Sequence, residues 1–194
     1  MPKNSRAKNK SHINQVRIIG GIWRSRLLKF PDLPGLRPTP QRSRETLFNW
    51  LGQTLDGTSC LDLFAGSGAL GFEALSRGAS SVVMVENAAQ ARTFLLENAR
   101  TLGAGSRLRV IFQDATEFLR ASQEQFDLIF VDPPFGLGLI PDLLPGLLGQ
   151  VKAGGHVYVE SELDLFELPE GFRLKKKTKA GMACHALLEV IKNI

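Results

Sequence analysis

Two short stretches of this 194-residue chain combine residue types that could do chemistry on a bound organic molecule. Gly66-Ser67-Gly68-Ala69-Leu70-Gly71 has the G-x-G-x-x-G spacing, in which glycines let the backbone approach a ligand closely. Asp132-Pro133-Pro134-Phe135 joins a carboxylate and an aromatic ring to two prolines, which donate no backbone N–H. The first stretch predicts a cofactor loop and the second a rigid catalytic turn.

Acidic residues near the glycine loop bear on the kind of cofactor. Glu86 lies 20 residues after Gly66, a spacing that also fits a dinucleotide whose ribose is held by an acid. Asp62 is unfavourable beside a pyrophosphate but suits an ammonium group, and Asp114 can accept a hydrogen bond from an adenine amino group. Three acids around one pocket favour a cationic cofactor, S-adenosylmethionine, unless they only cap strand ends and helices. The expected contact residues are Asp62, Phe64, Ala65, Gly66, Ser67, Gly68, Glu86, Asn87, Asp114, Ala115 and Asp132.

The catalytic turn suits an exocyclic amine that must become a nucleophile. The Asp132 carboxylate and the Pro133 carbonyl can each accept one N–H, which frees the nitrogen lone pair for in-line attack on a methyl group. Phe135 can stack on a base that has been extruded from its helix or loop. We therefore expect Asp132, Pro133, Pro134 and Phe135 to be catalytic, although a tight loop with an exposed aromatic ring is the plainer alternative.

A parallel sheet must position these two stretches. Continuous apolar runs alternate with helical patterns, which is typical of a sheet buried on both faces. Phe172–Lys177 and Ala183–Ile191 predict a terminal antiparallel pair. The helical patterns lie at Ala69–Arg77, at 88–102, at Ala115–Arg120 and from Ile140 to Leu148. The remaining predicted strands are Cys60–Phe64, Ser81–Val85, Leu108–Phe112, Phe126–Val131 and His156–Val159.

The N-terminal part differs from this pattern. Val16–Ile19 and Leu27–Phe30 predict a small hairpin around Gly20-Gly21. Thr39-Pro40 predicts a helix N-cap followed by proline at the first helical position. The expected organisation is a basic flexible tail at 1–14, a hairpin arm and linker at 15–38, and an α/β domain at 39–194.

Charge is distributed unevenly along the chain. The net charge is +5, but residues 1–44 carry eleven Lys and Arg against one acid, and residues 45–172 carry seven against seventeen. This asymmetry predicts a polyanion site beside an acidic body, the alternative being a solvated basic tail. We expect nucleic acid to contact Arg17, Arg24, Arg26, Arg37, Arg42 and Arg44. For Arg42 and Arg44 the alternative is ion pairing on the helix surface.

Composition excludes several classes of protein. With 43% hydrophobic and 22% charged residues, a sizeable core can form. No apolar run is long enough to span a membrane, and the basic N-terminus lacks the apolar region of a secretory signal, although it could mimic a transit peptide. Cys60 and Cys184 are too few for a zinc site, and we expect no metal. A monomeric cytoplasmic protein is the expectation.

The chain resembles the RsmD family of bacterial ribosomal RNA methyltransferases over nearly its whole length. Beyond the two stretches above, which many amino-methyltransferases share, Gly35–Thr39 and Tyr158–Glu162 match. The most family-specific matches are Arg17-Ile18-Ile19-Gly20-Gly21-Ile22-Trp23-Arg24 and Arg42-Ser43-Arg44-Glu45-Thr46-Leu47-Phe48-Asn49-Trp50-Leu51. Phe112–Asp114 and Gly136–Gly138 depart from the family pattern.

The resemblance implies a seven-stranded Rossmann-like sheet with its last strand antiparallel. It also implies S-adenosylmethionine-dependent methylation of a guanine N2 in 16S rRNA, on a protein-bearing assembly intermediate of the small subunit. From the residues alone, other functions stay open: adenine-N6 methylation of DNA or RNA, since the same acceptors serve adenine, an NAD(P)-dependent oxidoreductase, and a non-catalytic nucleic-acid-binding module.

Overall fold

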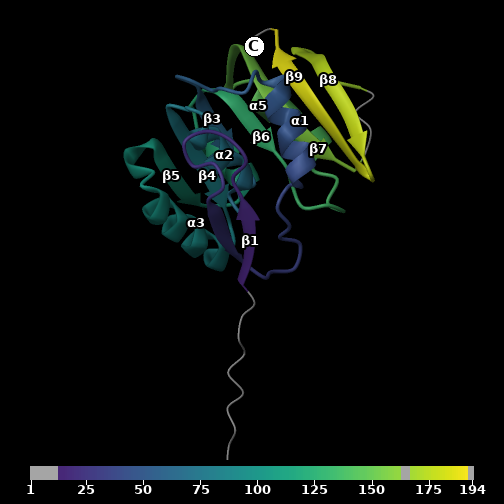
Figure 1. Ribbon diagram of the computed structural model, residues 1–194. Coiled ribbons are helices and arrows are strands. Elements are labelled where there is room, and N and C mark those ends of the chain that lie inside the picture. The colour runs from purple at the N-terminus through teal and green to yellow at the C-terminus, as the bar shows by residue number, and fades with distance from the viewer. Residues whose placement is uncertain (1–12, 163–166, 192–194) are drawn as a thin grey trace, which may run out of the picture.

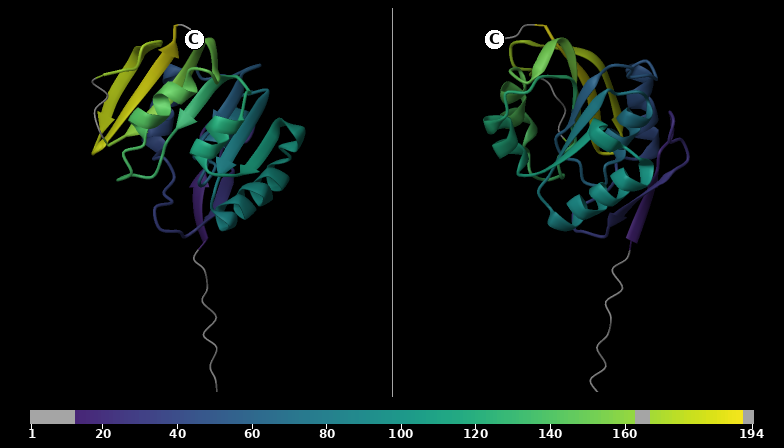
Figure 2. Two further views of the ribbon diagram at one scale, coloured as in Figure 1. Left: turned by 180° about the vertical axis from the view of Figure 1, so that it is seen from behind. Right: turned by 90° about the vertical axis from the view of Figure 1, so that its left-hand side faces the viewer.

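A seven-stranded sheet forms the middle of the protein (Figures 1 and 2). The computed structural model describes residues 13–162 and 167–191, so the tail predicted at 1–14 lies outside these residues except for its last two positions. The strand order is β5-β4-β3-β6-β7-β9-β8. The strands are β3 (Ser59–Asp62), β4 (Ser81–Glu86), β5 (Leu108–Phe112), β6 (Phe126–Val131), β7 (Val151–Ser161), β8 (Phe172–Ala180) and β9 (Ala183–Val190).

The strand directions confirm the predicted topology. The strands from β5 to β7 in this order are parallel, whereas β9 pairs antiparallel with β7 on one side and β8 on the other. The predicted terminal antiparallel pair is therefore present. The last strand of the chain enters the sheet between two earlier ones, so β8 forms the edge.

Helices cover both faces of the sheet (Figure 2). Buried side chains of the first three helices belong to one core cluster and those of the last two to another. The helices are α1 (Gln41–Trp50), α2 (Ala69–Ser76), α3 (Ala89–Leu102), α4 (Ala115–Ala121) and α5 (Ile140–Leu147), with a 3-10 turn at Gly105–Arg107. Within the described ranges, no helix has the length and apolar character that crossing a membrane requires.

An N-terminal hairpin of β1 (Ile13–Arg17) and β2 (Leu27–Pro31) forms a separate two-stranded sheet. Its first strand ends at Arg17, two residues before the predicted end. Ile18 still bonds across the hairpin, but to two different residues: its N–H donates to the Arg26 carbonyl and its own carbonyl accepts from the Ser25 N–H, which ends the regular ladder. The hairpin is therefore present, with the first strand shifted toward the N-terminus.

The connection between the hairpin strands is bound to α2. The Glu73 carboxylate accepts the N–H groups of Ile19 at 2.8 Å and Gly20 at 2.7 Å. A Cβ on Gly21, where φ is +72°, would lie 1.8 Å from the Ser76 carbonyl oxygen, so only glycine fits there. The Arg17–Arg24 stretch is thus the docking segment of the hairpin.

Candidate active site

The glycine loop follows β3 and turns the chain into α2. Gly66 and Gly68 have φ values of +48° and +78°. A Cβ on Gly68 would lie 2.7 Å from the Phe72 ring, and one on Gly71 would lie 2.4 Å from the Met84 methyl group. At Gly66 the nearest atom would be 3.8 Å away. Internal packing therefore requires the second and third glycines, and Gly66 is where a ligand can approach the backbone.

Asp62 ends β3 beneath this loop, with its side chain buried. Its Oδ2 accepts the Gly71 N–H at 2.9 Å, which ties the strand to the helix that the loop begins. Burial raises the pKa of Asp62 to about 7 despite this hydrogen bond, and the charges of Asp132 and Glu86 act in the same direction. A cation bound beside Asp62 would therefore favour the ionised form of its carboxyl group.

Glu86 and Asp114 follow the next two strands. Glu86 accepts the Gly66 N–H at 2.8 Å through Oε2 and the Ala88 N–H at 2.7 Å through Oε1, so it joins the glycine loop to the loop after β4. Asp114 is exposed and caps α4, its Oδ1 accepting the N–H of Thr116 at 2.8 Å. One oxygen of Asp114 therefore serves as a helix cap, which was the alternative to a cofactor contact. Glu86 and Asp114 both lie on the loops that border the site.

The remaining residues expected at the cofactor site lie on the same loops. Phe64 is half-buried and Ala65 is buried at the start of the glycine loop. Ser67 is buried, and its hydroxyl accepts the Ala69 N–H at 3.3 Å. Asn87 is exposed after β4, and Ala115 is buried at the start of α4. The buried members of this set can offer a ligand mainly backbone atoms, whereas the side chains of Phe64 and Asn87 are accessible.

The Asp-Pro-Pro-Phe turn leaves β6 at the same edge of the sheet. The Thr39 hydroxyl donates to Asp132 Oδ2 at 2.7 Å, and Pro133 is buried beneath the turn. Pro134 is exposed, and the Phe135 ring is 46% exposed. Thr39 was predicted to cap the following helix, but no side chain caps α1, and the Thr39 hydroxyl instead donates to the Asp132 carboxylate.

Burial raises the pKa values of the carboxylates of the site, and the charge of Asp132 adds to the rise at Asp62 and Glu160. Burial raises the pKa of Asp132 to about 6, and the Thr39 hydrogen bond opposes this rise. Glu160, at the end of β7, has a pKa raised to about 8 by burial and by the charge of Asp132. Raised pKa values on neighbouring acids indicate a site of strong negative potential. A sulfonium or ammonium group would relieve that repulsion, so the donor set fits S-adenosylmethionine.

Sequence reasoning missed a polar network behind Asp132. Tyr158 donates to Glu160 Oε2 at 3.4 Å, its oxygen lies 2.8 Å from His185 Nδ1, and Ser43 Oγ lies 3.4 Å from His185 Nε2. Polar residues within apolar β7 and β9, such as Glu160 and His185, were the available signal. His185 has three polar neighbours in this network: Tyr158, Ser43 and Glu160.

One of the arginines expected to bind nucleic acid is placed elsewhere. Arg44 is 1% exposed, and its guanidinium lies 3.3 Å from the Glu73 carboxylate and donates to the Thr39 carbonyl at 3.1 Å. It cannot reach a phosphate, so the prediction for Arg44 is wrong. The reason is that Glu73, which is completely buried on α2, needs cationic partners.

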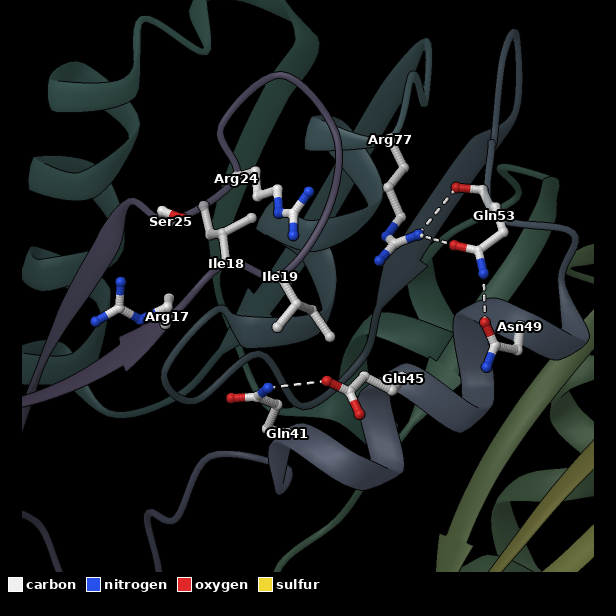
Figure 3. A pocket seen from close by; sticks show the side chains of 10 residues that line it. All are labelled: Arg17, Ile18, Ile19, Arg24, Ser25, Gln41, Glu45, Asn49, Gln53 and Arg77. Carbon is white, nitrogen blue, oxygen red and sulfur yellow. Dashed lines mark hydrogen bonds between the residues drawn. The ribbon is translucent and has the colours of Figure 1, made fainter.

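The other five predicted arginines are exposed: Arg17, Arg24, Arg26, Arg37 and Arg42. Within residues 13–162 and 167–191 none of their guanidinium groups forms an ion pair. Arg17 and Arg24 also line an open cavity of about 410 Å³ between the hairpin connection and α1 (Figure 3). Arg77, on the opposite wall, donates to the backbone and side-chain oxygens of Gln53 at 3.0 Å each. The surface beside the hairpin is therefore cationic and accessible.

The two predicted stretches meet because their strands are neighbours. β3 and β6 pair in parallel with Asp62 opposite Phe130, so the glycine loop and the Asp-Pro-Pro-Phe turn leave adjacent strand ends. Ligands of such sheets bind at this edge. A Rossmann-like sheet with an antiparallel last strand and a site of this kind place the protein in the class of S-adenosylmethionine-dependent methyltransferases.

Comparison with known proteins identifies the family. Residues 16–189 match a family model described as conserved hypothetical protein 95. Ribosomal RNA small subunit methyltransferase D of Escherichia coli strain K12 is 43% identical over 185 residues, 93% of each chain, and its Haemophilus influenzae counterpart is 41% identical over 90% of this chain and 94% of its own. The chain belongs to this family, the RsmD family of ribosomal RNA methyltransferases.

Solved structures agree with this assignment. A methyltransferase structure from Escherichia coli superposes with a TM-score of 0.81 at 41% identity, covering 92% of this chain and 99% of the other. A methyltransferase solved with S-adenosylhomocysteine shares the fold with a TM-score of 0.65 at 13% identity, covering 78% of this chain and 50% of its own. The oxidoreductase alternative therefore finds no support.

Proposed function

We propose that this protein transfers a methyl group from S-adenosylmethionine to the exocyclic N2 of one guanine in 16S rRNA. The observation that supports it best is the shared strand edge of the acid-rich glycine loop and Asp132. The substrate is a protein-bearing assembly intermediate of the small subunit, as the family resemblance implies. Such a substrate would place the reaction in the cytoplasm.

The cofactor supplies an electrophilic methyl group when it is bound. We assign its cationic part to the surroundings of Asp62, its ribose to Glu86 and its adenine to the loop that holds Asp114 and Ala115. Gly66 leaves room for its approach, because the space in front of this glycine is open.

The target amine is held by the catalytic turn. Thr39 occupies Asp132 Oδ2, so we assign Oδ1 to one amine N–H and the Pro133 carbonyl to the other. Both acceptors would draw the nitrogen toward tetrahedral geometry and leave its lone pair free to take the methyl group that the bound cofactor would supply. The methylated nitrogen, which is then positively charged, would release one proton to solvent. The exposed Phe135 ring stacks on the extruded base, a contact worth about 1–3 kcal/mol.

The exposed arginines hold the RNA backbone. Arg17, Arg24 and Arg26 lie on the hairpin and its connection, and Arg37 and Arg42 flank the segment that contains Thr39. Because none forms an ion pair within the described residues, each can neutralise a phosphate and release a counterion.

Labelled cofactor and small-subunit particles from a strain lacking the enzyme test this proposal. We expect label in N2-methylguanosine after digestion to nucleosides. The Asp132→Ala variant should lose turnover while its cofactor affinity, measured by calorimetry, stays within a few-fold. Label in N6-methyladenosine, or no label in any guanosine, would refute the proposal.

A further inference from the structure

Two acidic side chains lie next to each other at the ends of β6 and β7. The strands pair in parallel with Val131 opposite Val159, so the following residues, Asp132 and Glu160, are neighbours. Side chains alternate along a strand, and Phe130 and Tyr158, two residues earlier, both belong to the core cluster beneath α1. Glu160 therefore projects from the same face as the catalytic carboxylate.

A buried relay fixes the Glu160 carboxylate. Burial lowers the pKa of His185, which is therefore neutral near pH 7. One arrangement satisfies its contacts: Ser43 donates to His185 Nε2, the Nδ1–H donates to the Tyr158 oxygen, and Tyr158 donates to Glu160. Both Tyr158 and His185 lie against Oε2, at 3.4 and 3.5 Å. These contacts orient the carboxyl group through one of its oxygens.

Packing alone does not account for an acid at this position. Placing a second negative charge beside Asp132 is unfavourable in a buried site. A glutamine would keep the hydrogen bond from Tyr158 without that repulsion. Glu160 is an unfavourable acid beside Asp132, which indicates that its carboxyl group contacts the substrate.

Guanine and adenine differ at the ring atom next to the reacting amine. Guanine N1 carries a hydrogen and donates, whereas adenine N1 has a lone pair and accepts. Of the two ring atoms that flank the guanine N2, the proposal places N1–H toward the neighbouring strand β7, where Glu160 lies. We propose that Glu160 accepts the guanine N1–H and thereby selects guanine over purines whose N1 is an acceptor. This specificity role rests on the proposed guanine-N2 activity.

A base analogue tests the role without altering the protein. In 2,6-diaminopurine the N2 amine is retained, but N1 is an acceptor. Small-subunit particles are reconstituted with this base or guanine at the modified position, once mass mapping has located it. The assay is run at about pH 8.5, above the Glu160 pKa of about 8, so that the carboxylate can only accept. We expect wild-type enzyme to transfer methyl to N2 of guanine at least about 100-fold faster in single turnover, because a site built to accept a hydrogen rejects a base that lacks it. Equal rates would overturn the inference.

A variant then assigns the discrimination to Glu160. The amide of Glu160→Gln can donate to an N1 acceptor, so the preference should fall to within about 10-fold. The matched control is Glu162→Gln, also beside the catalytic turn, where the native carboxylate accepts the Gly136 N–H at 2.9 Å. The control should keep the wild-type preference.

The outcomes separate the two proposals. An unchanged preference in Glu160→Gln, with both rates lowered equally, would reduce Glu160 to a structural role. Failure of the wild-type enzyme to methylate guanine N2 at all would instead refute the proposed function. Calorimetry with S-adenosylmethionine checks that each variant retains its cofactor site.

Discussion

Replacing Thr39 by valine tests how the carboxylate of Asp132, which we propose to be catalytic, is held. The hydroxyl of Thr39 donates to Asp132 Oδ2 at 2.7 Å and favours the ionised form of an otherwise poorly solvated acid. Valine keeps the shape of threonine but removes this donor, so the pKa of Asp132 should rise above its value of about 6. Because the ionised carboxylate is the hydrogen-bond acceptor in the proposed mechanism, activity should rise with pH through that pKa, and the variant should reach its plateau at higher pH.

The size of the effect follows from the kind of hydrogen bond. A hydrogen bond to a charged group contributes about 1.5–3 kcal/mol, which corresponds to roughly 10–150-fold in rate if the whole contribution is lost. Part of this loss is recoverable at high pH, where Asp132 is ionised in both proteins. The remainder reflects poorer orientation of the carboxylate and should persist at every pH.

Single-turnover methylation of small-subunit particles from pH 5 to pH 9 measures both parts. Thr39→Ser retains the hydroxyl and serves as the control, for which we expect the wild-type profile. Superimposable profiles for the valine variant and the wild type would show that Thr39 does not control the ionisation of Asp132.

Three further predictions concern stability and RNA binding. Glu73→Gln should destabilise the protein by about 3–5 kcal/mol in urea unfolding, because the buried guanidinium groups of Arg44 and Arg77 lose their anionic partner. The control Glu97→Gln, on an exposed helix surface, should change the stability little, and equal effects of the two variants would refute this prediction. Replacing Arg17 and Arg24 by alanine should weaken binding to particles and reduce the salt slope by about 1.4, so an unchanged slope would remove them from the interface. The pKa of Asp132 is raised to about 6 in the folded protein, so the wild type loses stability as pH rises from about 4 to 6. Without cofactor, the free energy of unfolding of Asp132→Asn should therefore equal that of the wild type at pH 4 and exceed it by up to about 3 kcal/mol at pH 8. A constant difference across that range would contradict the assigned ionisation.

Local patterns predicted the parts of the site that depend on local structure. The glycine loop and the Asp-Pro-Pro-Phe turn each follow an apolar strand, and parallel strands place their carboxyl ends at one edge, so the sequence predicted that both lie at that edge. Their direct adjacency depends on the pairing of β6 with β3, which are not consecutive strands. Spacing also predicted that Glu86 belongs to the same pocket as the glycine loop, and its carboxylate accepts the Gly66 N–H.

Contacts between distant segments could not be predicted in this way. Arg44 is a charged residue in a helix, so the sequence suggests that its side chain is exposed. Only the packing of α1 on α2 shows that it forms an ion pair with the buried Glu73. The Glu160 and His185 pairing depends on β9 entering the sheet beside β7, a register that no short sequence pattern encodes. The hydroxyl of Thr39 fitted a helix cap equally well until the position of Asp132 was known.

The single carboxylate of Glu73 joins three segments: the hairpin connection, α1 through Arg44, and α2 itself. Trimming the chain at the linker before α1 would leave this buried anion without the N–H groups of Ile19 and Gly20. A shortened enzyme that begins at residue 39 should therefore misfold rather than work as an autonomous catalytic unit. The same attachment means that, in the RNA contact we propose, the arginine-bearing hairpin is already in place and has little ordering entropy left to lose on association.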